Sequence, residues 1–158
     1  MKVTRKKNAK VIASLETLAD FGNTSVEVGW IQAGQRHEDT KLTVPQLAAV
    51  QEYGAVAGNG AVIPPRPMLR TTVRKRSKQW VRQAEELSKA VIEGKIKQAE
   101  DIFGALVADD VKAMINDSSN WTPNAPATVR RKGKNTPLID TGAMRDAVDY
   151  RVHKGKIR

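Results

Sequence analysis

Residues 67–116 read PMLRTTVRKRSKQWVRQAEELSKAVIEGKIKQAEDIFGALVADDVKAMIN, and they carry the longest helical pattern in the chain. Apolar side chains recur there at intervals of three and four residues, which is the period of an amphipathic α-helix. Because Gly94 interrupts the pattern, we expect one long helix from Pro67 to about Gly94 and a second over residues 96–116. Such helices must bury their apolar faces against each other or against a sheet. The apolar positions are Leu69, Val73, Trp80, Ala84, Leu87 and Val91 in the first helix, and Ala99, Ile102, Phe103, Leu106, Val107, Val111, Met114 and Ile115 in the second.

Two candidate strands lie on either side of the long helices. Over residues 24–31, the apolar Val26, Val28 and Trp30 alternate with small or polar side chains, which is the period of a half-buried strand. A second strand is expected over residues 147–153. These two strands are the best candidates to pair, which would join both ends of the chain in one sheet.

Between the first strand and the long helices, the sequence predicts a short helix and a stiff connection. Thr43 and Gln46 have the spacing of a capping box, and the helix that they begin is expected to end at Tyr53-Gly54. Residues 55–67 are rich in glycine and proline, so we expect an extended and stiff connection there. The prolines that stiffen it are Pro64, Pro65 and Pro67.

These patterns together predict one α+β domain spanning residues 1–158. A small, mostly antiparallel sheet is expected to pack against the two long amphipathic helices. A short N-terminal helix is expected over about residues 5–21, and mobile basic ends over about residues 1–5 and 154–158.

Composition excludes several classes of protein. The chain contains no cysteine, which removes disulfides, thiol catalysis and cysteine-bearing metal sites. No apolar run approaches the roughly 20 residues that span a bilayer, so we expect a soluble protein made in the cytoplasm that has no membrane contact. The sequence has no phosphate-binding glycine loop and no paired carboxylates at catalytic spacing, and we therefore predict no cofactor, no metal site and no enzymatic activity.

Basic residues are concentrated in a few stretches of the chain. The formal net charge is +10, and residues 66–82 hold seven Lys or Arg residues without one acid, whereas residues 83–117 hold eight acids and four lysines. Such asymmetry predicts a surface that faces a polyanion or an acidic partner. The residues that we expect on this DNA-facing or partner-facing surface are Arg66, Arg70, Arg74, Lys78, Arg82, Arg130, Arg131 and Lys132.

The basic pattern allows three interpretations. Arg70, Arg74, Lys78 and Arg82 recur at spacing four, which suits a stripe that faces phosphate groups. Aromatic residues are nearly absent from the basic stretches, which argues against a platform for stacking single-stranded bases. Sequence-independent electrostatic contact with nucleic acid is therefore one interpretation, an acidic protein partner is another, and simple solvation of helix faces is the third.

The tripeptide Asp140-Thr141-Gly142 allows two interpretations, an active-site loop or a helix cap. With the apolar residues before it, it resembles the active-site loop of retroviral-type aspartic proteases, in which two carboxylates share one proton. That fold needs a substantial chain after the aspartate, and only 18 residues follow Asp140. The simpler prediction is that Asp140 or Thr141 caps a short helix that begins near Ala143.

Two longer stretches resemble a known family. The first comprises VGWI at residues 28–31, VPQLAAVQEYG at 44–54 and IPPRPMLR at 63–70, and the second comprises NAPATVRRKG at 124–133 and PLIDTGAM at 137–144. Together they resemble the tail-completion and head–tail joining (neck) proteins of tailed bacteriophages. The similarity covers most of residues 26–152. Residues 145–148 depart from it, because these proteins often place a small polar and a β-branched residue there.

The resemblance implies a structural virion protein that has no enzymatic activity. A neck protein completes the head-proximal end of the tail or joins it to the head. The resemblance implies a closed ring that matches the six-fold tail, contacts with other neck, portal or tail proteins, and sequence-independent contact with packaged DNA. It places the protein in the virion and, during assembly, in the host cytoplasm. A free accessory protein that binds nucleic acid without sequence preference is the alternative.

The motifs of the resemblance are expected to shape the backbone. Gly54 is expected to end its helix with a positive φ, which suits glycine. The three prolines are expected to fix the start of the long helix. Asp140 and Thr141 are expected to cap the next element. The residues of this structural motif are Tyr53, Gly54, Pro64, Pro65, Pro67, Asp140, Thr141 and Gly142.

Overall fold

The computed structural model describes residues 23–32, 34 and 41–155, and it has the predicted α+β architecture. The expected N-terminal helix and the basic end at residues 1–5 lie outside the described residues. In chain order, the elements are β1 (Thr24–Gly29), α2 (Val44–Tyr53), β2 (Ala55–Val56), β3 (Val62–Ile63), α3 (Met68–Ile92), α4 (Ala99–Asn116), a 3₁₀ turn η1 (Ser118–Asn120), α5 (Pro126–Lys132), α6 (Ala143–Asp146) and β4 (Asp149–Lys154).

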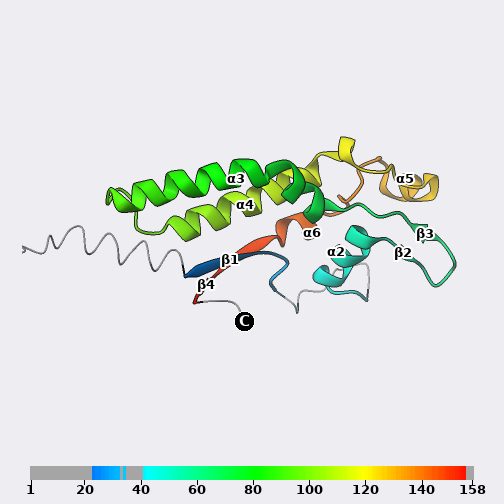
Figure 1. Cartoon of the computed structure of the whole chain (residues 1–158). Coiled ribbons are helices and arrows are strands. Elements are labelled where there is room, and N and C mark those ends of the chain that lie inside the picture. Colours follow the sequence, from blue (N-terminus) through cyan, green and yellow to red (C-terminus); the bar gives the residue numbers. More distant parts are fainter. Residues whose placement is uncertain (1–22, 33, 35–40, 156–158) are drawn as a thin grey trace, which may run out of the picture.

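The long elements form three layers (Figure 1). The antiparallel helices α3 and α4 lie along each other, and α4 packs against the sheet formed by β1 and β4. The helix α4 is thus sandwiched between α3 and the sheet. The short elements α2, β2, β3 and α5 gather at one end of this stack, where the candidate site lies.

The predicted pairing of the first and last strands is confirmed. Strands β1 and β4 are antiparallel, with Thr24 opposite Lys154 and Gly29 opposite Asp149. The last strand begins two residues later than predicted, because Ala147 and Val148 still bond to carbonyl groups of α6. It also includes Lys154, so the prediction of a mobile end over residues 154–158 is wrong for this residue.

The residues between α2 and α3 are more ordered than predicted. Instead of an extended connection alone, they form a hairpin in which Ala55 pairs with Ile63 and Val56 with Val62. A tight turn closes the hairpin, because the Gly60 N–H donates to the Ala57 carbonyl. The valines Val56 and Val62 are 72% and 75% exposed, so the hairpin contributes little to the core.

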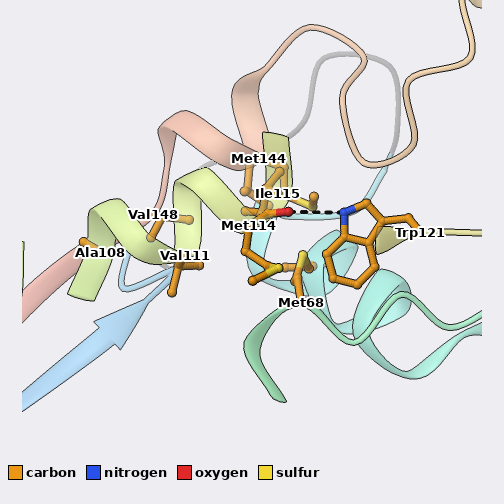
Figure 2. Packing of buried hydrophobic residues seen from close by; sticks show 10 residues of the cluster. Met68, Ala108, Val111, Met114, Ile115, Trp121, Met144 and Val148 are labelled. Carbon is orange, nitrogen blue, oxygen red and sulfur yellow. Dashed lines mark hydrogen bonds between the residues drawn. The ribbon is translucent and has the colours of Figure 1, made fainter. Parts of the chain in front are cut away.

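The hydrophobic core lies where the C-terminal half of α4 meets the short elements (Figure 2). Met68 at the start of α3 and Ile115 near the end of α4 are fully buried there. Full burial of one such side chain contributes roughly 1.5–3 kcal/mol to stability. The buried cluster comprises Val44, Ala48, Met68, Ala108, Val111, Met114, Ile115, Trp121, Met144 and Val148.

Each of the three tryptophans fixes a contact between two segments through its indole N–H. Trp30 donates to the Met144 carbonyl at 2.6 Å, which joins the end of β1 to α6. Trp121 donates to the Met114 carbonyl at 3.2 Å (Figure 2). Trp80 donates to Asp110 Oδ2 at 2.7 Å and thereby joins α3 to α4. The same carboxylate lies 3.3 Å from Arg76 Nε, so a hydrogen bond and an ion pair account for Asp110 beside the apolar stripe.

A glycine allows α4 to lie directly on the sheet. Gly104 is buried in α4, and a Cβ atom placed on it would lie 2.4 Å from Cδ2 of Tyr150 in β4. Carbon atoms at optimal separation lie about 3.5–4.0 Å apart. Only a residue without a side chain therefore permits this approach of helix and ring.

Candidate functional site

The junction between α2 and α3 is built around one buried carboxylate. Glu52, near the end of α2, is only 4% exposed. Its Oε2 accepts from the Leu69 N–H at 2.9 Å, and its Oε1 accepts from the Arg70 N–H at 3.2 Å. Pro67, the N-cap residue of α3, provides no side-chain cap. Glu52 therefore supplies from another helix the acceptors that the first turn of α3 needs.

The same carboxylate holds Arg70 over Tyr53. Arg70 Nε donates to Glu52 Oε1 at 2.9 Å, and Nη2 donates to the Glu52 carbonyl at 2.8 Å. The guanidinium lies 5.0 Å from the centroid of the Tyr53 ring, which is the geometry of a cation–π contact. Tyr53 nevertheless remains 71% exposed. Its ring is thus held in place on the surface.

Gly54 ends α2 as predicted. It adopts φ 77°, and its N–H donates to the Val50 carbonyl at 2.8 Å. A Cβ atom at this position would lie 2.8 Å from the Ile63 carbonyl oxygen. Glycine is therefore required both by the positive φ and by the close approach of β3. The predicted capping box at Thr43 and Gln46 is also present.

Arg66 is not on the surface, which corrects the sequence prediction. Its residue exposure is 6%, and burial lowers the pKa of its guanidinium below the ordinary value. A buried cation must be hydrogen-bonded, and Arg66 donates to Gln51 of α2 and to the segment that precedes α5. Its acceptors are Gln51 Oε1 at 2.9 Å, the Thr122 carbonyl at 3.1 Å, Asn124 Oδ1 at 3.3 Å and the Pro123 carbonyl at 3.4 Å. Arg66 thus joins two segments inside the fold.

Residues 126–132 form the helix α5, which contains three of the predicted surface cations. Gly133 ends it in the left-handed conformation. Arg130 is exposed, whereas Arg131 pairs with Asp140 at 3.2 Å. Lys132 Nζ donates to the Thr136 and Ile139 carbonyls, and burial lowers the pKa of this ammonium group. Of these three predicted surface cations, only Arg130 has no hydrogen bond or ion pair from its side chain within the described part of the chain.

Of the two residues predicted to cap α6, Thr141 and Asp140, only Thr141 bonds to its first turn. The Thr141 hydroxyl accepts from the Ala143 N–H at 3.2 Å, although Gly142 occupies the N-cap position of α6 with φ 93°. Asp140 does not cap the helix, because its carboxylate turns to Arg131. Leu138, two residues earlier, has φ 64°, which is uncommon for a residue other than glycine.

The motif stretches meet around one cavity of about 420 Å³. Its walls come from α2, β3, the segment before α5, α5 itself and the loop into α6. Residues far apart in the sequence are therefore assembled at one place. Those that line the cavity and belong to the predicted site are Pro64, Arg66, Arg131, Lys132, Asp140, Thr141 and Gly142.

The rest of the predicted basic surface lies on the outer face of α3. Arg70, Arg74, Lys78 and Arg82 are all exposed. The Arg70 side chain keeps 60% exposure despite its ion pair with Glu52. Arg74, Lys78 and Arg82 have no ion-pair partner among the residues that the structure describes. Three charges of the stripe are thus available to an external partner.

Sequence reasoning missed Glu52 and Gln51, which hold the start of α3. Both lie in the motif stretch at residues 44–54, but nothing in the sequence pairs them with residues 66–70. In the described ranges, no group of three His, Asp or Glu side chains is placed to hold a metal ion. None of the helices described is long and apolar enough to cross a membrane.

No family model matches this chain, and no significantly similar curated protein or solved structure was found.

Proposed function

We propose that this protein is a non-enzymatic structural component of a tailed-bacteriophage virion, which completes the tail or joins head and tail as part of a neck ring. One observation carries the proposal: the motif stretches that resemble neck proteins converge at a single junction. There Gly54 ends α2, Glu52 and Arg66 hold the start of α3, and Thr141 assists the start of α6. These residues determine backbone geometry, which is what a subunit of a rigid assembly requires.

The assembly proposed is a closed homo-oligomeric ring that is six-fold related. Its other partners would be neck, portal or tail proteins, in the virion and in the host cytoplasm during assembly. A ring requires heterologous contacts, in which each subunit offers two different surfaces. The exposed cations Arg74, Lys78 and Arg82 would give a ring of this protein a positive rim suited to packaged DNA.

Ring formation is the test of this proposal. Negative-stain electron microscopy of the purified protein is expected to show closed rings, and native mass spectrometry is expected to give six copies of the 17.4 kDa chain. Mass spectrometry of purified particles should also detect the protein. A protein that stays monomeric at all concentrations and is missing from mature particles would contradict the proposal.

The alternative, a free nucleic-acid-binding accessory protein, is favoured by Arg74, Lys78 and Arg82, exposed cations of α3 that have no ion pair within the described residues. Replacing Arg74, Lys78 and Arg82 with glutamine is expected to weaken DNA binding and to reduce the slope of log K against log salt by up to about 3, since each phosphate contact contributes about 0.9. Gel shifts over a salt series measure this slope.

The control for this experiment is the triple variant Lys89→Gln, Lys95→Gln and Lys97→Gln, which removes equal charge at the other end of the α3–α4 pair. It should leave the slope unchanged. Tight binding by the isolated monomer would favour the accessory protein, whereas weak binding together with ring formation favours the neck protein. Equal effects of the two triple variants would show that the stripe is not the DNA-binding surface.

A further inference from the structure

An apolar groove of about 590 Å³ lies between α2 and the first turns of α3. Two of its side chains, Tyr53 and Val73, are 71% and 53% exposed although they are large and apolar. Exposed apolar side chains that line one groove are typical of an interaction site. The groove is lined by Trp30, Pro45, Ala48, Ala49, Glu52, Tyr53, Leu69, Arg70, Val73 and Arg74.

The exposed edge of this groove is preorganised. The buried Glu52 carboxylate fixes Arg70, and Arg70 lies over the Tyr53 ring. Tyrosine and arginine are enriched among the residues that dominate binding energy at protein interfaces. Ordering them before binding lowers the conformational entropy that is lost when a partner docks.

The charge around the groove restricts its occupant. Arg70 is neutralised by Glu52, but Arg74 has no ion pair within the described residues, and Lys78 lies one turn further along α3. The groove therefore has an apolar floor and a positive rim. A complementary occupant presents an apolar surface beside a negative charge.

The chain itself carries such a surface on α4. Four exposed residues of α4, spaced three, four and four apart, form a stripe that neither α3 nor the sheet covers. Ile102 is its large apolar side chain, 44% exposed, and Asp109 is its charge, for which no ion pair exists within the described part of the chain. The two alanines allow another backbone to approach closely. The stripe comprises Ile102, Ala105, Asp109 and Ala113.

We propose that the α2–α3 groove of one copy receives the α4 stripe of a second copy, with Ile102 directed at Val73 and Asp109 at Arg74. The proposal rests on the ring assembly proposed above, and it names the contact. Groove and stripe are different surfaces of one chain, so each copy uses its groove with one neighbour and its stripe with the other. This is the heterologous arrangement that a ring needs.

Site-specific cross-linking tests the contact. Because the chain has no cysteine, Val73→Cys and Ile102→Cys introduce the only thiols in their respective variants. Under mild oxidation, a mixture of the two variants is expected to give disulfide-linked dimers well above the yield from either variant alone. The matched control is a mixture of the Val81→Cys and Ile102→Cys variants. Val81 is 59% exposed on α3 and lies outside the groove. This control mixture should give no such increase.

A charge exchange tests the same contact without cross-linking. Arg74→Glu places two acids together in the interface, and Asp109→Arg places two cations together. Each single change is expected to weaken self-association about tenfold or more, whereas the double variant should recover most of it. Lys89→Glu makes the same charge change on α3 outside the groove and should have little effect. Analytical ultracentrifugation measures the association.

The outcomes separate this inference from the proposed function. If rings form but the Val73–Ile102 cross-link does not, the groove contact is overturned and the ring proposal stands. The same holds if the original protein forms rings but the double exchange does not restore the self-association that each single change weakens. If the Val81 control links as well as Val73, the contact is also overturned. Absence of rings together with absence from particles would overturn both proposals.

Discussion

Replacing Gly104 with alanine is expected to lower the free energy of unfolding by about 2 kcal/mol. The new methyl group would lie 2.4 Å from Tyr150 Cδ2 and 2.7 Å from Cγ, so the ring or the helix must move. Overpacking of this kind costs roughly 1–3 kcal/mol, and the upper end applies because the obstacle is a ring held between helix and sheet. The better helix propensity of alanine returns about 1 kcal/mol. Urea denaturation followed by circular dichroism measures the difference.

Two further variants show whether the Tyr150 ring is the cause. Gly58→Ala adds the same methyl group where no atom lies within 4 Å and φ is not positive, so its stability should be unchanged or slightly higher. In a Tyr150→Ala background, Gly104→Ala should become neutral or stabilising, because the obstacle is gone. A Gly104→Ala protein as stable as the original would show that α4 and β4 do not approach as described.

Replacing Glu52 with alanine is expected to cost about 3 kcal/mol of stability. The change leaves the Leu69 and Arg70 N–H groups without their acceptor and creates a cavity beside the core. Loss of a buried acceptor costs roughly 1–3 kcal/mol, and a charged acceptor more. Glu52→Gln keeps one acceptor oxygen but loses the charge, so an intermediate loss of about 1–2 kcal/mol is expected. Thermal and urea unfolding measure both.

The control for the Glu52 variants is Glu86→Gln. Glu86 is an exposed residue of α3, and its replacement should change stability by no more than about 0.5 kcal/mol. Glu52→Ala should also release Arg70 from Tyr53 and so weaken self-association at temperatures where the variant is still folded. If Glu52→Gln and Glu86→Gln have equal stability, the carboxylate does not hold the start of α3.

Features that depend on neighbouring residues could be predicted from the sequence. The two long helices follow from the spacing of their apolar residues, and the start of α2 follows from the capping box at Thr43 and Gln46. The helix stop at Gly54 follows from the conformations open to glycine. Pairing of β1 with β4 could be inferred because few strands compete for one sheet.

Features that depend on distant residues could not be predicted. Arg66 belongs to a basic stretch, yet most of its acceptors come from residues 122–124, so nothing near it in the sequence indicates burial. Helix α5 has four basic residues around its C-terminal end and no apolar period. It is held instead by contacts of Arg131 and Lys132 with the loop that follows.

The candidate groove was hidden from sequence analysis for the same reason. In the sequence, Tyr53 belongs to a motif and Arg70 to a basic stripe 17 positions away, and only the fold shows that Glu52 brings them together. The exposed stripe of α4 could not be predicted, because the spacing of Ile102 places it with the apolar residues expected on the buried face of the helix. Ile102 is 44% exposed, because α3 and the sheet cover other sides of α4 and leave the side that carries Ile102 open.

The three anchored indoles give this protein built-in optical reporters. Trp30, Trp80 and Trp121 connect different pairs of segments, so each senses the separation of a different part of the fold. Trp121 is 6% exposed and should emit at shorter wavelength than Trp80, whose ring N–H contacts a carboxylate. Variants that retain a single indole would therefore reveal by fluorescence whether the helical pair and the motif junction melt together or in succession.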